Sequence, residues 1–317
     1  MKQFLNLGNK DTRSGFGAGL LEAGKEDSNI VAMAADLASS VKMDAFAKEF
    51  PDRFFQCGIA EANMIGVASG LAIGGKTVFA GSFAEFVTGR VYDQIRQEVA
   101  YGNANVKVCA SHAGLTLGED GATHQTMEDI ALMRALPGMV VINPCDYNQT
   151  KAATLAVAKY KGPVYLRFGR PAVPNFTPAD QVFEIGKAIT LNEGSDVTIF
   201  ATGHLVWEGI QACQMLEDEG ISAELIDIAT IKPLDTEAVI ASVKKTGAAV
   251  CAEEHNTAGG LGELICMTLA TGYPAPVELV TGGDRFGQSG TPSELLKAYG
   301  LDAAHIAAAA KKAISRK

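Results

Sequence analysis

The sequence predicts two consecutive α/β domains, each with a mostly parallel sheet that is covered by helices on both faces. The length of 317 residues fits two compact domains. Short apolar runs alternate with longer segments of helical spacing, which is the order that parallel α/β folds require. The runs are apolar almost without interruption, as expected of parallel strands buried on both faces. We therefore expect a doubly wound arrangement in both halves of the chain.

Five apolar runs are the expected strands of the first domain. They cover residues 29–35, 77–80, 106–110, 140–143 and 163–167. Between them, residues 60–73 and 83–100 are long enough for several turns of helix. Strand and helix thus alternate through the first half of the chain.

A change of composition marks the boundary between the domains. Residues 170–184 contain three of the eleven prolines and follow neither the helical nor the strand period. We place the first domain at 1–175, a linker at 176–190 and the second domain at 191–317. In the second domain the expected strands are 196–201, 223–227 and 248–252, and the expected helices are 205–217, 236–246, 261–269 and 302–315.

The composition excludes several classes of protein. Hydrophobic residues make up 47% and charged residues 20%, as in ordinary globular proteins. The net charge is −9 without a basic cluster, so nucleic acid is not an expected partner. No apolar stretch is long enough to span a membrane, and the first residues do not resemble a signal peptide. Six cysteines without a C-x-x-C pair argue against a zinc site or a disulfide framework, so we expect a cytoplasmic protein.

Polar clusters follow the expected strands of the first domain, where doubly wound sheets bind their ligands. They are residues 36–40 (DLASS), 58–64 (GIAEANM), 82–86 (SFAEF), 111–125 (SHAGLTLGEDGATHQ) and 167–171 (RFGRP). The richest is 111–125, which contains His112, Asp120 and His124. Histidine is a useful acid or base near neutral pH. A solvated polar loop is the alternative, and the spacing does not favour a metal site.

Two further features have both an ordinary and a functional interpretation. Glu61, at the expected start of a helix, is either a surface residue that stabilises the helix dipole or a buried carboxyl group that can hold a proton. Phe83 and Phe86 share a face of the expected helix 83–100, which usually indicates core packing. The glycine pairs match neither a dinucleotide fingerprint nor a P-loop.

Taken in their order along the chain, these segments resemble the carboxyl-terminal half of transketolase. The resemblance rests on 11–13 (DTR), 36–40, 51–64 (PDRFFQCGIAEANM), 82–86, 111–125, 169–171 (GRP) and 230–235 (TIKPLD). It implies a parallel-sheet pyrimidine-binding domain followed by a smaller, mixed-sheet C-terminal domain of a thiamine diphosphate enzyme.

The resemblance also implies roles for individual residues. Glu61 would hydrogen-bond the aminopyrimidine ring of the cofactor, against which Phe83 and Phe86 would pack. Glu61, His112 and His124 would be the catalytic residues. The substrate would be bound by Arg13, Ser40, His112, Asp120, His124 and Arg170, with the arginines holding its phosphate.

One motif of the family is missing from this chain. Transketolases carry a G-D-G sequence and a later Asn that hold the diphosphate and Mg²⁺ or Ca²⁺. The resemblance therefore implies one subunit of a split enzyme, active only with an amino-terminal partner subunit in an α2β2 assembly. The reaction would move a two-carbon ketol unit from a ketose phosphate to an aldose phosphate, as in the pentose phosphate pathway.

Three alternatives stay open. Half of a deoxyxylulose phosphate synthase and the β subunit of a 2-oxoacid dehydrogenase share this two-domain organisation, but the expected phosphate site together with residues 51–64 favours transketolase over both. The chain could also be an interaction subunit that has lost its chemistry.

Overall fold

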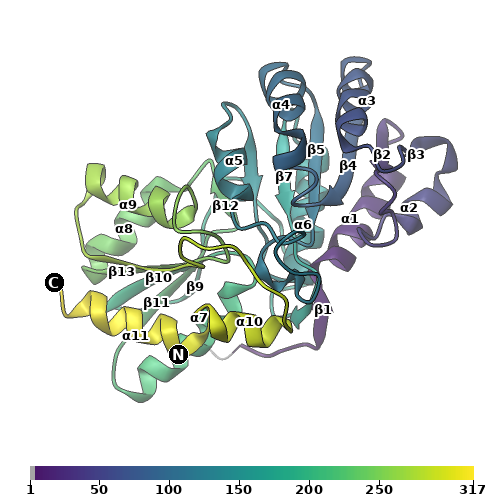
Figure 1. The fold of residues 1–317 in the computed structure, drawn as a ribbon. Helices are drawn as coiled ribbons and strands as arrows, with labels where there is room; N and C mark the ends of the chain where they lie inside the picture. Colours follow the sequence, from purple (N-terminus) through teal and green to yellow (C-terminus); the bar gives the residue numbers. More distant parts are fainter. Residues whose placement is uncertain (1–3) are drawn as a thin grey trace.

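The computed structural model describes residues 4–317 of the chain. Two large sheets, a seven-stranded one mainly from the first half and a five-stranded one from the second, stand beside each other with helices around both (Figure 1). Among residues 4–317, no helix is long and apolar enough to cross a membrane. All six cysteines carry free thiols.

The first sheet has seven strands in the order β12-β6-β7-β5-β4-β2-β3. Its strands are β2 (Ile30–Ala34), β3 (Phe54–Gln56), β4 (Thr77–Phe83), β5 (Val106–Ser111), β6 (Val140–Ile142), β7 (Val164–Arg167) and β12 (Thr230–Lys232). All pairings are parallel except that of β12 with β6. The central strands β2, β4 and β5 are buried along their whole length, which explains their continuous apolar sequence.

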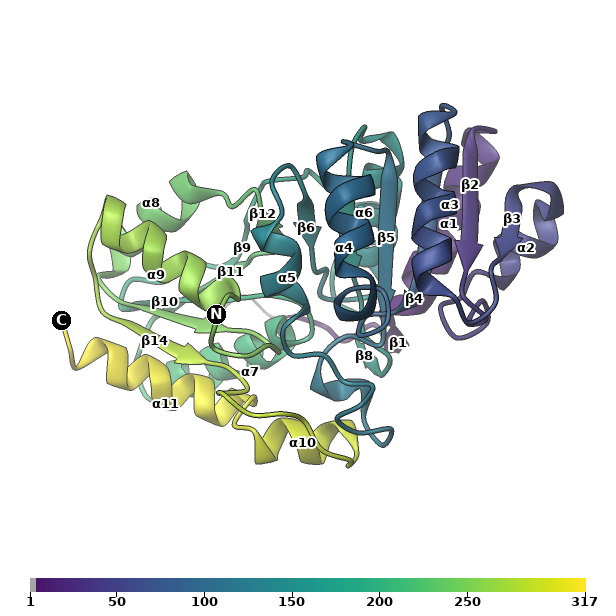
Figure 2. The same cartoon turned by 45° about the horizontal axis from the view of Figure 1, so that its top comes forward.

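Helices cover both faces of this sheet, as a doubly wound fold requires. One face packs against α1 (Thr12–Glu26), α2 (Asp44–Glu49) and α6 (Tyr147–Lys159). The other packs against α3 (Glu61–Ile73), α5 (Asp129–Ala135) and α4 (Tyr92–Gln94), which continues into the π-helical segment η3 (Ile95–Tyr101). In Figure 2, α3 and α4 stand side by side in front of β4 and β5, and residues of α3 contact α4 and η3.

The second sheet has five strands in the order β14-β13-β10-β11-β9. They are β9 (Ile189–Asn192), β10 (Val197–Ala201), β11 (Ala223–Asp227), β13 (Ala249–Ala252) and β14 (Val277–Val280). Only β9 runs antiparallel, so the sheet is mixed, as expected. One face packs against α7 (Leu205–Asp218), α10 (Pro292–Ala298) and α11 (Ala303–Ile314). The other packs against α8 (Thr236–Thr246) and α9 (Leu261–Gly272), within the core that continues into the first half.

The predicted helix over residues 83–100 is wrong in its first half. Strand β4 continues to Phe83, and the next residues form turns and the 3₁₀ segment η2 (Gly89–Val91) before α4 begins at Tyr92. The reason is that all seven residues of β4 are buried in the sheet, so the apolar strand extends beyond residue 80. Phe83 and Phe86 therefore do not share a helix face.

The proline-containing segment 170–184 holds regular structure that the sequence did not predict. Strand β8 (Ala172–Pro174) lies in it and pairs antiparallel with β1 (Asn9–Asp11). Strand β9 begins at Ile189, inside the expected linker 176–190. We keep the limits 1–175, 176–190 and 191–317 as a proposal.

Candidate functional site

The polar clusters predicted from the sequence meet at one edge of the first sheet. Segments 36–40, 82–86, 111–125 and 167–171 follow or include the carboxyl ends of β2, β4, β5 and β7. Because these strands are parallel and adjacent, their ends lie at the same edge.

Glu61 is the first residue of α3 and is only 3% exposed. The Ser82 hydroxyl group donates to its Oε1 at 3.4 Å, and Arg90 Nη1 donates to its Oε2 at 3.1 Å. The interpretation as a surface residue is therefore wrong. Sequence reasoning missed Arg90, whose half-exposed side chain gives no local signal of an ion pair with a distant carboxylate.

Aromatic rings extend from Glu61 toward the loop after β5. Phe83 stacks on the His112 ring at 3.8 Å between centroids and on Phe86 at 5.7 Å. Phe86 also meets His124 edge-on at 5.2 Å, and the Arg90 guanidinium carbon lies 4.1 Å from its centroid. The row offers flat apolar surfaces next to one buried carboxylate, an arrangement that suits a heteroaromatic ring with hydrogen-bonding nitrogens.

His112 is buried, and its backbone has a φ of 58°. Its Nδ1 lies 2.8 Å from the Ser111 hydroxyl, and its Nε2 lies 3.5 Å from Arg13 Nη1. Because arginine can only donate, Nε2 is the acceptor and Nδ1 carries the proton. Burial, together with the charges of Arg13, Arg170 and Lys42, lowers the pKa of His112 to about 3. The ring is therefore neutral near pH 7 and acts through hydrogen bonds rather than as a cation.

Arg13 lies at the start of α1 and faces the same edge. Its Nη1 donates to the Ser40 carbonyl oxygen at 3.1 Å, and its Nε is 3.3 Å from Asp11 Oδ1. That Nε is buried without a hydrogen-bond partner of good geometry among the described residues. Burial lowers the pKa of Arg13, with the Arg170 charge acting in the same direction. An anion between the two arginines would relieve this repulsion.

Arg170 is the second arginine at this edge, and with Arg13 it forms a positively charged region. Its Nη1 donates to the Leu117 carbonyl oxygen at 2.7 Å and to Glu119 Oε2 at 2.9 Å. Lys42, which the sequence analysis did not select, adds a third positive charge that acts on His112. Its only sequence signal is its position just after the segment 36–40.

The remaining two residues are less enclosed. His124 is half-buried, with its Nδ1 3.0 Å from the Thr123 hydroxyl. Asp120 is exposed, and within residues 4–317 no hydrogen bond or ion pair joins it to the other predicted residues. Contacts and charge interactions thus link Glu61, Phe83, Phe86, His112, His124, Arg13, Ser40 and Arg170. Asp120 lies in the same loop, next to the Glu119 that pairs with Arg170.

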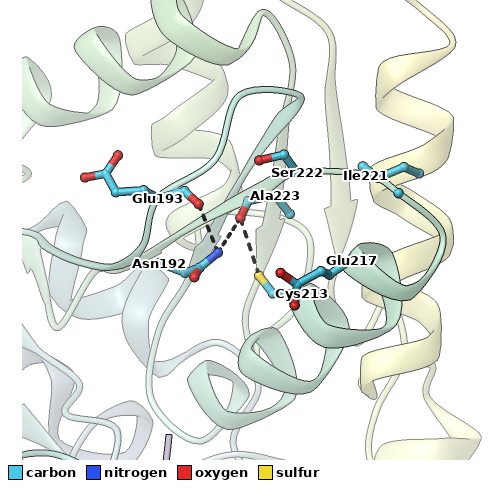
Figure 3. Close-up of a pocket in the computed structure, with 8 residues that line it drawn as sticks. Asn192, Glu193, Cys213, Glu217, Ile221, Ser222 and Ala223 are labelled. Carbon is cyan, nitrogen blue, oxygen red and sulfur yellow. Dashed lines mark hydrogen bonds between the residues drawn. The ribbon is translucent and has the colours of Figure 1, made fainter. Parts of the chain in front are cut away.

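A surface pocket of about 260 Å³ lies elsewhere, in the second half of the chain (Figure 3). It is lined by residues around the β9–β11 pair and α7, including Asn192, Cys213 and Ala223. Asn192 Nδ2 donates to the Ala223 carbonyl oxygen at 2.8 Å, and the Cys213 thiol lies 3.9 Å from the same oxygen. None of the predicted site residues lines this pocket. In residues 4–317, no group of three or more His, Cys, Asp or Glu side chains could hold a metal ion.

Comparison with known proteins identifies both halves of the chain. Residues 9–175 match the model of the transketolase pyrimidine-binding domain, and residues 186–306 match that of the transketolase C-terminal domain. The chain is also similar to a solved structure described as a split gene transketolase, inactive beta4 tetramer. The two are 45% identical with a TM-score of 0.91, over 98% of this chain and 100% of the other.

Two curated relatives are separate subunits of similar length. One, from Clostridium sp., is a subunit of a 6-deoxy-6-sulfo-D-fructose transketolase and is 44% identical over 94% of this chain and 92% of its own. The other, from Phocaeicola vulgatus, is a subunit of an apulose-4-phosphate transketolase and is 40% identical over 92% of this chain and 93% of its own. The chain thus belongs to the transketolase family and corresponds to its carboxyl-terminal half, a pyrimidine-binding domain followed by the C-terminal domain.

Proposed function

We propose that this chain is the catalytic carboxyl-terminal subunit of a split, thiamine diphosphate-dependent transketolase. It would act in an α2β2 assembly with an amino-terminal subunit that holds the diphosphate and Mg²⁺ or Ca²⁺. The reaction is transfer of a two-carbon ketol unit from a ketose phosphate to an aldose phosphate, as in the pentose phosphate pathway. We place the assembly in the cytoplasm because all six cysteines are free thiols.

The observation that carries the proposal is the buried Glu61 beside the Phe83 and Phe86 rings. These three residues fit an aminopyrimidine, because the carboxyl group can hydrogen-bond a ring nitrogen while the aromatic rings pack against its face. When bound, thiamine diphosphate supplies the carbanion chemistry of ketol transfer. Glu61 would hold the proton that is shared with the pyrimidine ring, and Ser82 and Arg90 would keep its side chain in place.

The positive region supports an anionic sugar as the substrate. Arg13 and Arg170 would bind the terminal phosphate, since each guanidinium can donate two parallel hydrogen bonds. Neutral His112 and half-buried His124 would orient substrate oxygens, and exposed Asp120 would contact a hydroxyl group. The named substrates of the two curated relatives carry a sulfonate and a phosphate, respectively. Both substrates support an anionic group at one end of the sugar, and we favour phosphate because of the two arginines.

Co-purification of the chain from its native cells tests the proposal. We expect an equimolar partner that bears a G-D-G motif and a later Asn. The pair should transfer a ketol unit from xylulose 5-phosphate, and thiamine diphosphate with Mg²⁺ should raise its melting temperature. Glu61→Gln should abolish most of the activity, because an amide cannot hold the shared proton.

Other results would contradict it. Full activity of the Glu61→Gln complex would remove Glu61 from catalysis. A stable partner complex that thiamine diphosphate does not stabilise would favour an interaction subunit. Ketol transfer by the chain alone, without an amino-terminal subunit, would overturn the split-enzyme assignment.

A further inference from the structure

A buried carboxylate from the second half of the chain reaches the substrate loop of the first half. Glu254 follows β13 and is 3% exposed. Its Oε1 accepts the backbone N–H of Thr116 in a short hydrogen bond. Thr116 lies in the middle of residues 111–125, the segment that carries His112 and His124.

The loop backbone closes tightly over this carboxylate. Gly114 has a φ of 79°, and a Cβ atom built on it would lie 2.5 Å from the carboxyl carbon of Glu254. Only glycine combines this conformation with so close an approach. The fit of loop and carboxylate is therefore specific rather than a chance contact between two surfaces.

Both sides of the contact are themselves fixed. The Glu254 carbonyl oxygen accepts from Arg167 Nη2 at 2.9 Å, and Arg167 is held by a buried ion pair with Asp129. The far end of the loop is held by Gln125, whose Nε2 donates to the Leu115 and Gln288 carbonyl oxygens at 2.9 and 3.0 Å. Gln288 also belongs to the second half of the chain.

We propose that Glu254 is a positioning residue for ketol transfer. It fixes the loop from which His112 and His124 reach the substrate, and so makes the second half of the chain part of substrate binding. This inference rests on the proposed function. Without the Glu254 side chain, the Thr116 N–H is left without its acceptor and the loop can shift. Errors of about 1 Å in such groups reduce rates by up to about a hundredfold.

The adjacent residue provides a matched control. Glu253 is also buried, and its carboxylate accepts the Leu261 and Gly262 N–H groups, each at 2.7 Å, at the start of α9. In the described part of the chain, no hydrogen bond joins its side chain to residues 111–125. Glu253→Ala and Glu254→Ala therefore remove the same chemical group at nearly the same burial, at a helix end in one case and at the substrate loop in the other.

The experiment compares Glu254→Ala, Glu254→Gln and Glu253→Ala in the two-subunit complex. We expect Glu254→Ala to lower kcat/KM for xylulose 5-phosphate at least about tenfold, mainly through KM. Amide hydrogen exchange of residues 113–118 should become faster. The thermal shift with thiamine diphosphate should persist, because Glu61, Phe83 and Phe86 are untouched. Glu254→Gln should recover most of the loss, since its amide oxygen can still accept from Thr116. Glu253→Ala should leave kcat/KM and loop exchange unchanged.

Other outcomes would overturn the inference. An unchanged KM and unchanged loop exchange in Glu254→Ala would show that the loop does not depend on this carboxylate. An equal loss of kcat/KM in Glu253→Ala would show that Glu254 contributes only to general stability. If Glu254→Ala does not fold, Gly114→Ala displaces the loop from the other side and should raise KM in the same way. A wild-type complex without ketol transfer would overturn the proposed function. Hydrogen exchange of the loop would still test whether Glu254 fixes it.

Discussion

His112 shows how its neighbours decide what a histidine can do. The sequence suggested an acid or base near neutral pH, but burial and the charges of Arg13, Arg170 and Lys42 lower its pKa to about 3. A neutral imidazole in a positive region can bind oxygen atoms by hydrogen bonds without adding to the positive charge. This suits the binding of a sugar hydroxyl or carbonyl group better than proton transfer at pH 7.

The low pKa of His112 also predicts how stability depends on pH. Between about pH 6.5 and pH 3 the unfolded chain binds a proton at this residue that the folded chain does not, so stability falls as the pH drops. His112→Gln removes this contribution, which is about 2 kcal/mol between pH 7.5 and pH 5. Urea midpoints at the two pH values should therefore differ less in the variant than in the wild type. Parallel changes in both proteins would show that His112 titrates normally in the folded state.

At the scale of single residues, sequence reasoning selected most of the residues that the structure brings together at this edge, but not the residues that pair with them. Their residue types and their positions after expected strands made Glu61 and His124 candidates, and the family resemblance implied their roles. Whether Glu61 was buried could not be decided, because burial depends on strands and loops distant in sequence. Arg90 and Lys42 were missed for the same reason, since each acts on a group that tertiary folding brings to it.

At the scale of elements, the close packing of α1 against α6 places Arg13. Gly19 of α1 faces Thr154 of α6, and a Cβ atom on Gly19 would lie 2.7 Å from that of Thr154. A side chain at this point would push the two helices apart and shift the start of α1. The glycines of α1 thus serve the packing of the helix that carries a proposed phosphate ligand.

Gly19→Ala should therefore destabilise the protein in spite of alanine's higher helix propensity. We expect a loss of about 1–3 kcal/mol in the free energy of unfolding, because the added methyl group overpacks the contact. Gly70→Ala in α3 is the control, since a Cβ atom there would meet nothing within 4 Å. That variant should gain about 0.5–1 kcal/mol from propensity alone. Urea denaturation measures both, and a stabilised Gly19→Ala would show that the helices can separate at little cost.

Element prediction succeeded for segments whose own apolar pattern indicates which residues are buried. The apolar runs of β2, β5 and β10 and the amphipathic spacing of α8 and α11 were recognised with small errors at their ends. It failed for residues 83–91, where apolar residues at a spacing of three belong to a strand end and a turn. The short β8 was missed because its pairing with β1 joins segments that are far apart in the sequence.

At the scale of the whole molecule, the two halves share more than a linker. Strand β12 of the second half completes the first sheet, and one apolar core runs from α3 and α5 to α8 and α9. The motif at 230–235 contributed to the family resemblance but gave no sign that it is an edge strand of the other domain. Strand order in a sheet depends on long-range pairing, which alternating sequence patterns do not encode.

Asp227 connects the two halves of the chain through a hydrogen bond, and the stability of the protein should therefore depend on its protonation. Asp227 is the last residue of β11 and is fully buried. Its Oδ2 accepts a hydrogen bond from Gln149 Nε2 of α6 at 2.5 Å. Burial raises the pKa of Asp227 to about 7. Between about pH 4 and pH 7 the folded chain holds a proton here that the unfolded chain has lost, so stability falls as the pH rises.

Asp227→Asn keeps an oxygen for Gln149 and removes the titration. The variant should raise stability at pH 8, by up to about 4 kcal/mol, but little at pH 4. Melting temperatures of the variant and the wild type at both pH values test this. If the difference between Asp227→Asn and the wild type is the same at both pH values, Asp227 is ionised throughout, and the contact between the halves does not depend on its proton.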